Sequence, residues 1–261
     1  MITSLANPKV KYARSLSRRR VRYRERAFCI EGFRLVKDAW EAGIVPAFVF
    51  YAAGEEGAPW RDLIAAMAER GVPCYEASST VIEALSDTVT PQGIVAVVPM
   101  PEASSSPSGD LHLVLDRVQD PGNLGAILRV AAAVGVDHVW IAPGTVDPFN
   151  PKAVRSAMGA HFRVTMTVAS WEEIGVALRG MDVWVADSRG DRLYDAVDWT
   201  RPAALVLGGE AHGASQEAMR LCAGTIAIPM ANQVESLNAA VAAGVILYEA
   251  ARQRRARAAG L

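Results

Sequence analysis

The hydrophobic residues of the chain gather in short runs, which are separated by segments with a helical spacing of apolar and polar positions. In the first hundred residues, four such runs predict β-strands: FCIEG from Phe28, AFVFYA from Ala47, PCYEA from Pro73 and GIVAVV from Gly93. The segments between them, RLVKDAWEAG, WRDLIAAMAERG and TVIEALSD, predict helices. Strands that alternate with helices are typical of a small α/β domain.

A segment dense in Pro, Ser and Gly, residues 100–109, has few bulky apolar side chains and is typical of a linker. We therefore place the domain boundary there. The prediction is a basic extension with a small α/β domain over residues 1–99, the linker over 100–109, and a second domain over 110–261.

The second domain repeats the alternation of strands and helices. Buried strands are predicted at 111–116, 138–142, 182–187, 204–208 and 225–229. A helix is predicted around 124–134, and Asn150-Pro151 begins a short helix that ends at Gly159, because asparagine is a good N-cap and proline suits the first helical position. The last helix is predicted from Ser236 through Arg255. Short apolar strands between helices indicate a parallel sheet that is buried on both faces.

The net charge of −1 hides a strong asymmetry. Residues 1–26 carry nine Lys or Arg and one acid, which gives +8, and residues 252–261 carry four Arg and no acid. The segment between them has a net charge of −13. Local basic patches of this kind favour polyanions as partners, although solvated charge runs are the simpler explanation.

Several classes of protein are excluded by what the sequence lacks. No run reaches the roughly 18 uncharged apolar residues of a membrane span, and the start has no apolar secretory core. Cys29, Cys74 and Cys222 lie far apart without a CxxC pair, so we expect no disulfide framework, no metal and a reducing cytoplasm. The Arg- and Ser-rich start also resembles an organelle transit peptide, but it continues without a break into the strand at Phe28.

Three loops that follow predicted strands of the second domain have an unusual polar composition: residues 117–125, 208–213 and 229–238. Ligands of parallel sheets gather at the carboxyl ends of the strands, which makes these loops the candidate site. A dinucleotide-binding site or an ordinary methyltransferase fold would instead need a GxGxxG turn after the first strand, and that turn is missing here.

The polar residues of these loops also have ordinary structural explanations. Asn123 and Ser236 are competent helix N-caps, and Asn238 is tolerated in a first helical turn. Glu210 is explained as a turn residue between glycines. Arg129 is the only charged residue from 124 to 136, so it either reaches solvent from the edge of the core or faces a polar cleft. None of these explanations accounts for the gathering of the polar groups on one edge of a sheet.

Three ordered segments resemble the motifs of the SPOUT superfamily, in its SpoU/TrmH branch of RNA ribose 2′-O-methyltransferases. They are DPGNLGAILRVAAAVG at 120–135, GGEAHG at 208–213, and IPM followed by SLN within 228–238. The block NPKAVRSAMGAHF at 150–162 matches the pattern of that family between the first two motifs. The resemblance covers residues 111–255. The first domain resembles, less sharply, the L30e-like RNA-binding module.

This resemblance implies a fold, a cofactor and an assembly. The fold is a parallel sheet whose C-terminal segment threads a loop to form a deep trefoil knot, an exception to the usual unknotted topology. The cofactor is S-adenosylmethionine (SAM), and the protein is a homodimer formed by the second domain. The residues implied to bind SAM, largely through their backbone, are Gly208, Gly209, Ile228, Met230 and Leu237.

The resemblance also implies roles in catalysis and RNA binding. Arg129 contacts the RNA and helps to activate the ribose hydroxyl, and a polar cage around it consists of Asn123, Glu210, Ser236 and Asn238. Arginine is a poor base in water, so a phosphate or substrate-assisted route is expected for the proton. The expected RNA contacts elsewhere are Arg18, Arg19, Arg20, Arg22 and Arg155.

The leading hypothesis is therefore a cytoplasmic, SAM-dependent 2′-O-methyltransferase of rRNA, most simply of the 23S type, or of tRNA. One alternative is a non-catalytic RNA-binding or ribosome-assembly protein that retains the fold. Another is a different nucleotide-binding enzyme, such as a dehydrogenase. The sequence leaves open the modified nucleotide and the choice between a housekeeping role and antibiotic resistance.

Overall fold

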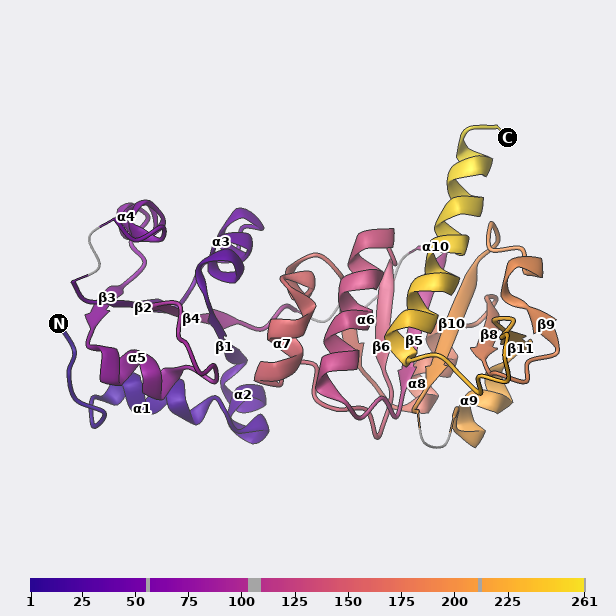
Figure 1. The fold of residues 1–261 in the computed structure, drawn as a ribbon, viewed down its shortest axis with the longest axis horizontal. Coiled ribbons are helices and arrows are strands. Elements are labelled where there is room, and N and C mark those ends of the chain that lie inside the picture. Colours follow the sequence, from indigo (N-terminus) through magenta and orange to yellow (C-terminus); the bar gives the residue numbers. More distant parts are fainter. Residues whose placement is uncertain (55–56, 103–108, 211–212, 261) are drawn as a thin grey trace. The chain divides into compact units, whose positions relative to one another are not determined.

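The computed structural model describes residues 1–54, 57–102, 109–210 and 213–260 (Figure 1). Contacts divide the chain into two compact units. The first unit consists of Met1–Pro101 and Phe149–Phe162, and the second of Glu102–Pro148 and Arg163–Leu261. We predicted residues 149–162 as part of the second domain, whereas they pack with the first unit. Most of the predicted linker, residues 103–108, lies outside the described residues.

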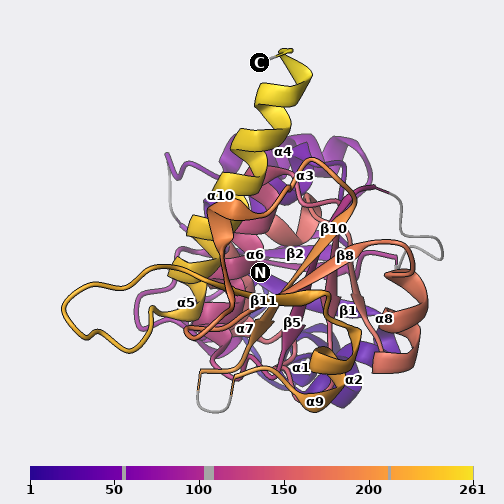
Figure 2. The same cartoon turned by 90° about the vertical axis from the view of Figure 1, so that its right-hand side faces the viewer.

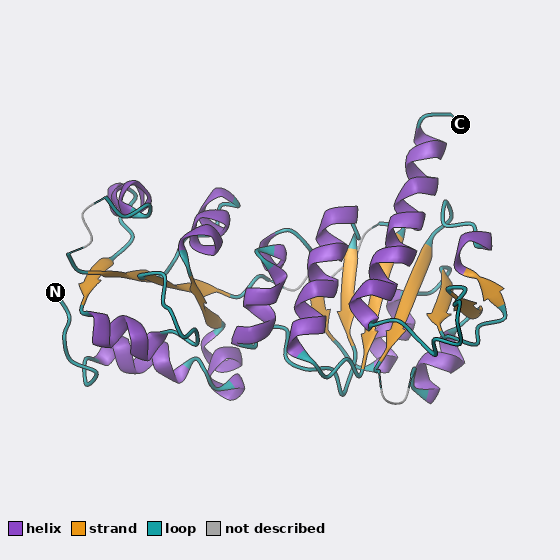
Figure 3. Cartoon of the chain, viewed as in Figure 1, coloured by secondary structure: helices purple, strands orange, loops and turns teal. Residues whose placement is uncertain are grey.

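The first unit contains a four-stranded sheet in the order β1-β4-β2-β3. β4 pairs antiparallel with β1 and β2, and β3 pairs parallel with β2. In Figure 3 helices lie on both faces of this sheet. The elements are β1 (Ala27–Glu31), β2 (Phe48–Ala52), β3 (Cys74–Ala77), β4 (Ile94–Pro99), α1 (Pro8–Ser15), α2 (Arg19–Glu25), α3 (Phe33–Glu41), α4 (Arg61–Glu69) and α5 (Ser79–Leu85).

The basic N-terminal segment forms two helices, α1 and α2, that are separated by a short turn. Asn7 caps α1, since its side chain accepts a hydrogen bond from the backbone N–H of Lys9. The turn is stabilised by Arg22, which is only 3% exposed. Its Nη1 donates to the carbonyl oxygens of Leu16 and Ser17, at 2.7 Å each. Arg22 was predicted to contact RNA, but the structure shows that it also holds the backbone between the two helices.

The segment Phe149–Phe162 joins the first unit through aromatic packing. The ring of Phe28 on β1 lies 5.1 Å from the ring of Phe149 and 6.2 Å from the ring of Phe162. This segment contains α7 (Pro151–Ala157) and a 3-10 turn, η1 (Ala160–Phe162). As predicted, Asn150 caps α7 and accepts a hydrogen bond from the backbone N–H of Lys152.

The second unit contains a seven-stranded sheet in the order β7-β6-β5-β10-β8-β11-β9, and every pairing is parallel. The predicted parallel α/β sheet is therefore confirmed, whereas β7 and β9 were not predicted. The strands are β5 (Leu111–Asp116), β6 (His138–Ile141), β7 (Met166–Val168), β8 (Asp182–Ala186), β9 (Arg192–Leu193), β10 (Ala203–Gly208) and β11 (Gly224–Ala227). The knot implied by the family resemblance stays a prediction.

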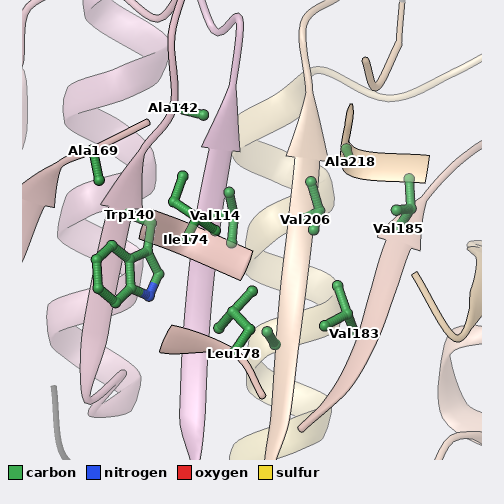
Figure 4. Close-up of a cluster of buried hydrophobic side chains, with 11 residues drawn as sticks. Val114, Trp140, Ala142, Ala169, Ile174, Leu178, Val183, Val185, Val206 and Ala218 are labelled. Carbon is green, nitrogen blue, oxygen red and sulfur yellow. The ribbon is translucent and has the colours of Figure 1, made fainter. Parts of the chain in front are cut away.

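Helices cover both faces of this sheet. The helical elements are α6 (Pro121–Val134), α8 (Trp171–Ala177), α9 (Gln216–Leu221), α10 (Ala239–Ala258) and a 3-10 turn, η2 (Tyr194–Ala196). α10 packs against α6 and β10, while α8 and α9 pack together on the other side. Figure 4 shows Ile174 and Leu178 of this second layer against Val114 and Val206 of the sheet. Because both faces are buried, the central strands are almost wholly apolar.

Two predicted helix starts are wrong by a few residues. Asp120 caps α6, because its side chain accepts from the backbone N–H of Asn123, so Asn123 lies in the first turn. The last helix begins at Ala239, and its cap is Asn238 instead of Ser236. Both differences matter for function, since they free the side chains of Asn123 and Ser236 from capping.

The role of Arg22 in the turn gives a test of stability. Arg22→Ala leaves two carbonyl oxygens without their donor, so we expect the free energy of unfolding to fall by roughly 2 kcal/mol. The matched control is Arg20→Ala, an exposed site on the same helix, where we expect a change within about 0.5 kcal/mol. Urea unfolding of both variants measures the difference, and equal losses would contradict the assignment.

Candidate functional site

The candidate site forms at the carboxyl edge of the sheet in the second unit. All seven strands run in the same direction, so the loops after β5, β8, β10 and β11 leave from this edge. β5 and β10 are neighbours, and the last residues of the two strands, Asp116 and Gly208, are paired in register. Two of the three predicted loops are therefore adjacent, although about ninety residues separate them in the sequence.

A cavity of about 590 Å³ is lined by the segments that follow β8, β10 and β11 and by the start of α10. The five residues predicted to bind the cofactor all line it: Gly208, Gly209, Ile228, Met230 and Leu237. Ile228, Met230 and Leu237 come from the segment between β11 and α10, which extends to the left in Figure 2. The structure thus brings together all the residues that were predicted to form the cofactor site.

Glycine is required at two of these positions because backbone approaches backbone closely. A Cβ atom at Gly208 would overlap the main chain of Gly213 and Ala214. A Cβ atom at Gly209 would overlap the carbonyl oxygen of Arg117 in the loop after β5. The two glycines therefore allow the loop after β10 to fold back on itself and to contact the neighbouring loop.

Three of the predicted catalytic residues form a hydrogen-bonded chain across the loops. The Nδ2 group of Asn123 donates to Glu210 Oε1, and Asn238 Nδ2 donates to Asn123 Oδ1 at 3.0 Å. Asn238 also caps α10 through its side-chain oxygen. Ser236 lines the cavity together with Glu210, and its side chain is exposed. The network therefore joins all three sequence motifs, and it reaches the cavity through Glu210.

Arg129 lies apart from this network. It is exposed on α6, and within the described residues it makes no hydrogen bond or ion pair. Asn123 precedes it by six residues, so the two side chains leave the helix in different directions. The polar cage around Arg129 is therefore not formed within the described chain, and its catalytic role stays a prediction.

The residues predicted to bind RNA all lie in the first unit. Arg18, Arg19 and Arg20 are exposed, and the guanidinium of Arg19 stacks over the ring of Tyr23 at 5.4 Å. Arg155, on α7, forms an ion pair of 3.5 Å with Asp87.

Asp116 connects the first two loops, although it is not among the predicted site residues. This carboxylate is fully buried at the end of β5. Its Oδ2 accepts a hydrogen bond of 2.5 Å from the backbone N–H of Ser215, the residue that caps α9. Its Oδ1 lies 3.6 Å from Nε of Arg117. An acid that ends a mostly apolar strand was the available signal, because a buried carboxylate requires partners.

A second group that sequence reasoning missed is the turn after β8. Asp187, Ser188 and Arg189 line the same cavity. The turn is fixed by the Asp187 side chain, whose Oδ1 accepts from the backbone N–H of Arg189 at 2.7 Å. The criterion applied to the other loops, polar residues directly after a buried strand, also selects this turn.

The chemistry of the lining fits SAM. Three carboxylates, Asp187, Glu210 and Glu235, face the cavity together with one guanidinium, Arg189. SAM carries a sulfonium and an ammonium group against a single carboxylate, so an excess of acids complements its net positive charge. The apolar side chains Ile228, Met230 and Leu237 suit the adenosine, and the volume lies in the range of small-ligand sites.

The described residues carry neither a metal-binding cluster nor a membrane-spanning helix. Among them, no group of His, Cys, Asp or Glu side chains is arranged to hold a metal ion. In the same residues, no helix combines the length and the apolar composition that crossing a membrane requires.

Comparisons with known proteins agree with this site. A family model described as the SpoU rRNA Methylase family matches residues 110–248, and an MRM3-like substrate binding domain matches residues 7–96. An uncharacterized tRNA/rRNA methyltransferase of Synechocystis sp. is 35% identical to the chain, covering 97% of it and 94% of the relative. The Bacillus subtilis 23S rRNA (guanosine(2553)-2′-O)-methyltransferase RlmP is 34% identical, covering 95% and 97%.

Solved structures show the same relationship. The AdoMet-bound rRNA methyltransferase from Sinorhizobium meliloti superposes with a TM-score of 0.84 at 32% identity, covering 96% of this chain and 97% of that one. The SpoU methyltransferase AviRb from Streptomyces viridochromogenes, in complex with AdoMet, gives 0.82 at 30% identity, covering 96% and 100%.

Fold, cavity and comparisons together define a SAM-dependent RNA methyltransferase. The chain belongs to the SpoU rRNA Methylase family, and its N-terminal part is an MRM3-like substrate binding domain. The predicted family, enzyme class and cofactor are thereby confirmed.

The close backbone approach at Gly208 gives a test of the cofactor site. In Gly208→Ala the new methyl group must displace the loop at residues 213–214, so we expect SAM affinity to fall by about tenfold or more. Gly244→Ala is the matched control, since nothing lies within 4 Å of a Cβ atom at that helical position. Calorimetric titration with SAM measures both variants. Wild-type affinity in a normally folded Gly208→Ala protein would remove this loop from the cofactor site.

Proposed function

We propose that the protein transfers the methyl group of SAM to a ribose 2′-hydroxyl of rRNA. The observation that carries this proposal is the arrangement at the carboxyl edge of the second unit. There, all the predicted cofactor residues line one cavity, and Glu210 of the same cavity is hydrogen-bonded to Asn123. The Bacillus relative named as a 23S rRNA 2′-O-methyltransferase favours a target of the same class over tRNA.

The residues of the site have separate roles in this proposal. SAM supplies a methyl group that is already activated by its sulfonium, so the protein must mainly orient the reactants and accept a proton. Gly208 and Gly209 bring the backbone close to the cofactor. Asn123, Glu210 and Asn238 offer hydrogen-bonding groups that position the ribose, and Ser236 extends them along the cavity.

Arg129 is the proposed RNA contact next to the reacting hydroxyl. It is available for this role because it is exposed and makes no polar contact within the described residues. Arginine does not release its proton at neutral pH, so its contribution is electrostatic: it holds a phosphate and stabilises negative charge that develops on the ribose oxygen. A substrate phosphate is the proposed acceptor of the proton.

The proposed assembly is a homodimer formed by the second unit, in the cytoplasm. The small residues of α10 support close packing, although part of that surface contacts α6 of the same chain: Ala243 is fully buried. Gly244 has open space at its Cβ position. Val241 and Tyr248, one heptad apart on α10, are 52% and 50% exposed, so they leave an apolar stripe for a second copy. The three free cysteines agree with a reducing compartment.

Replacement of Arg129 separates an enzyme from a non-catalytic RNA-binding protein. We expect Arg129→Ala to abolish methyl transfer while SAM affinity stays near the wild-type value, because the cofactor is held by other loops. Arg129→Lys should not restore activity, since lysine keeps the charge and loses the planar set of donors. Single-turnover methylation with labelled SAM and rRNA measures this, with thermal melting as a check of the fold. Turnover by the alanine variant would refute the catalytic role, and an inactive wild-type protein would favour the non-catalytic alternative.

The apolar stripe on α10 gives a test of the assembly. Tyr248→Asp should convert the dimer into a monomer at micromolar concentration, because it places a charge in the proposed interface. Val176→Asp on α8 is the matched control, since Val176 is 53% exposed and lies outside that interface. Light scattering on the full-length protein gives the mass. A wild-type monomer, or an unchanged dimer in Tyr248→Asp, would contradict the proposal.

A further inference from the structure

A second cavity, of about 530 Å³, lies entirely within the first unit. It is lined by residues of α1, the turn to α2, the strand β1, the end of α5, and α7 with the residues just before it. Arg155 lines it from α7, while Arg18 and Arg22 line it from the turn and α2. The fold thus gathers three of the predicted RNA contacts, from segments more than 130 residues apart, around one hollow.

The lining of this basic cavity carries an excess of positive charge. Its basic side chains are Lys11, Arg14, Arg18, Arg22 and Arg155. Its two carboxylates, Glu31 and Asp87, already have partners inside the protein. Glu31 accepts hydrogen bonds from the Ser86 hydroxyl at 2.8 Å and from the backbone N–H of Asp87 at 3.0 Å, and Asp87 pairs with Arg155.

The basic side chains of the cavity differ in whether they already have partners within the protein. Arg22 is committed to the carbonyl oxygens of Leu16 and Ser17, which fixes the turn that carries Arg18. Arg14 and Arg18, by contrast, are exposed and form no ion pair within the part of the chain that the structure describes. A turn held by Arg22 therefore presents two exposed guanidinium groups that form no ion pair within the described residues, which suits an external anion.

The floor of the cavity is apolar. Leu16, Ile30 and Phe149 line it, and all three are buried. Cys29 lies beside them, and burial raises the pKa of its thiol to about 12, so it adds no negative charge at neutral pH. A cationic rim above an apolar floor matches the two parts of a nucleotide, its phosphate and its base. The volume of the cavity is large enough for one nucleotide.

We propose that the basic cavity binds one nucleotide of the substrate RNA, with its phosphate at Arg14 and Arg18 and its base against the apolar floor. This inference rests on the proposed function, because it assumes an RNA substrate. A polynucleotide is favoured over a free nucleotide because the positive charge continues beyond the rim, onto the exposed residues Arg19 and Arg20 of α2. A chain that enters the cavity with one nucleotide keeps its neighbouring phosphates in contact with this surface.

The test uses full-length protein and 23S rRNA transcribed in vitro, with the dissociation constant measured by filter binding. Arg14→Ala/Arg18→Ala should raise it by about tenfold or more, and should lower the slope of log affinity against log salt by about 0.7 for each lost contact. Ser17→Phe fills the cavity without changing any charge, so a comparable rise is expected from loss of space alone. Arg34→Ala, an exposed site on α3 of the same unit, is the control and should stay within about twofold of wild type.

The outcomes separate this inference from its alternatives. Normal RNA binding by Ser17→Phe would refute the proposal that the cavity holds a nucleotide. The RNA affinity would then come only from charges on the surface. Titration with AMP provides a second arm: tight AMP binding that Ser17→Phe abolishes, with unchanged RNA affinity, would assign the cavity to a free nucleotide and overturn the proposal. Binding is measured without methylation, so a wild-type protein that binds this RNA and does not methylate it would count against the proposed function and not against the cavity.

Discussion

The parallel pairing of β5 with β10 is the constraint on which the site depends. It sets Asp116 beside Gly208, so that the two loops leave the sheet at the same level. The buried Asp116 carboxylate then binds the backbone N–H of Ser215, beyond the loop after β10. An unpaired buried carboxylate is costly, so this bond fixes Ser215, the cap of α9, at the end of β5. The contact of Asn123 with Glu210, and the cavity beside it, are consequences of that registration.

Glycine and carboxylate act together in this arrangement. Gly208 lets the main chain pass close to Gly213 and Ala214, and Gly209 lets it pass close to the carbonyl oxygen of Arg117. Three carboxylates around the same cavity produce a negative potential that suits a cationic cofactor. The shape of the site therefore comes from the backbone, and its preference for a cationic ligand comes from the acidic side chains that line the cavity.

Much of this was predictable from the sequence, because the signals were local. Apolar runs such as that of β5 predicted the strands, and the polar loops after them predicted where the site lies. The cofactor residues within those loops came from the family resemblance. The places where the structure differs from the prediction also have physical reasons. Asp120 and Asn123 are both good caps, and only the structure shows that Asp120 occupies the position, which frees Asn123 to bind Glu210. Membership of residues 149–162 in the first unit depends on the packing of Phe28 with Phe149, a contact between distant segments that no local pattern reveals.

The arginines show why composition alone assigns function poorly. Arg18 and Arg22 belong to the same basic run, yet Arg22 is buried against carbonyl oxygens while Arg18 is exposed at the rim of a cavity. Arg129 is likewise exposed, on a helix that is otherwise largely apolar. A guanidinium that the backbone already satisfies gains little from a phosphate, whereas one without a polar contact in the described chain keeps its donors for RNA. The fold thus divides chemically identical side chains between stability and recognition, and the distribution of their hydrogen bonds identifies which is which.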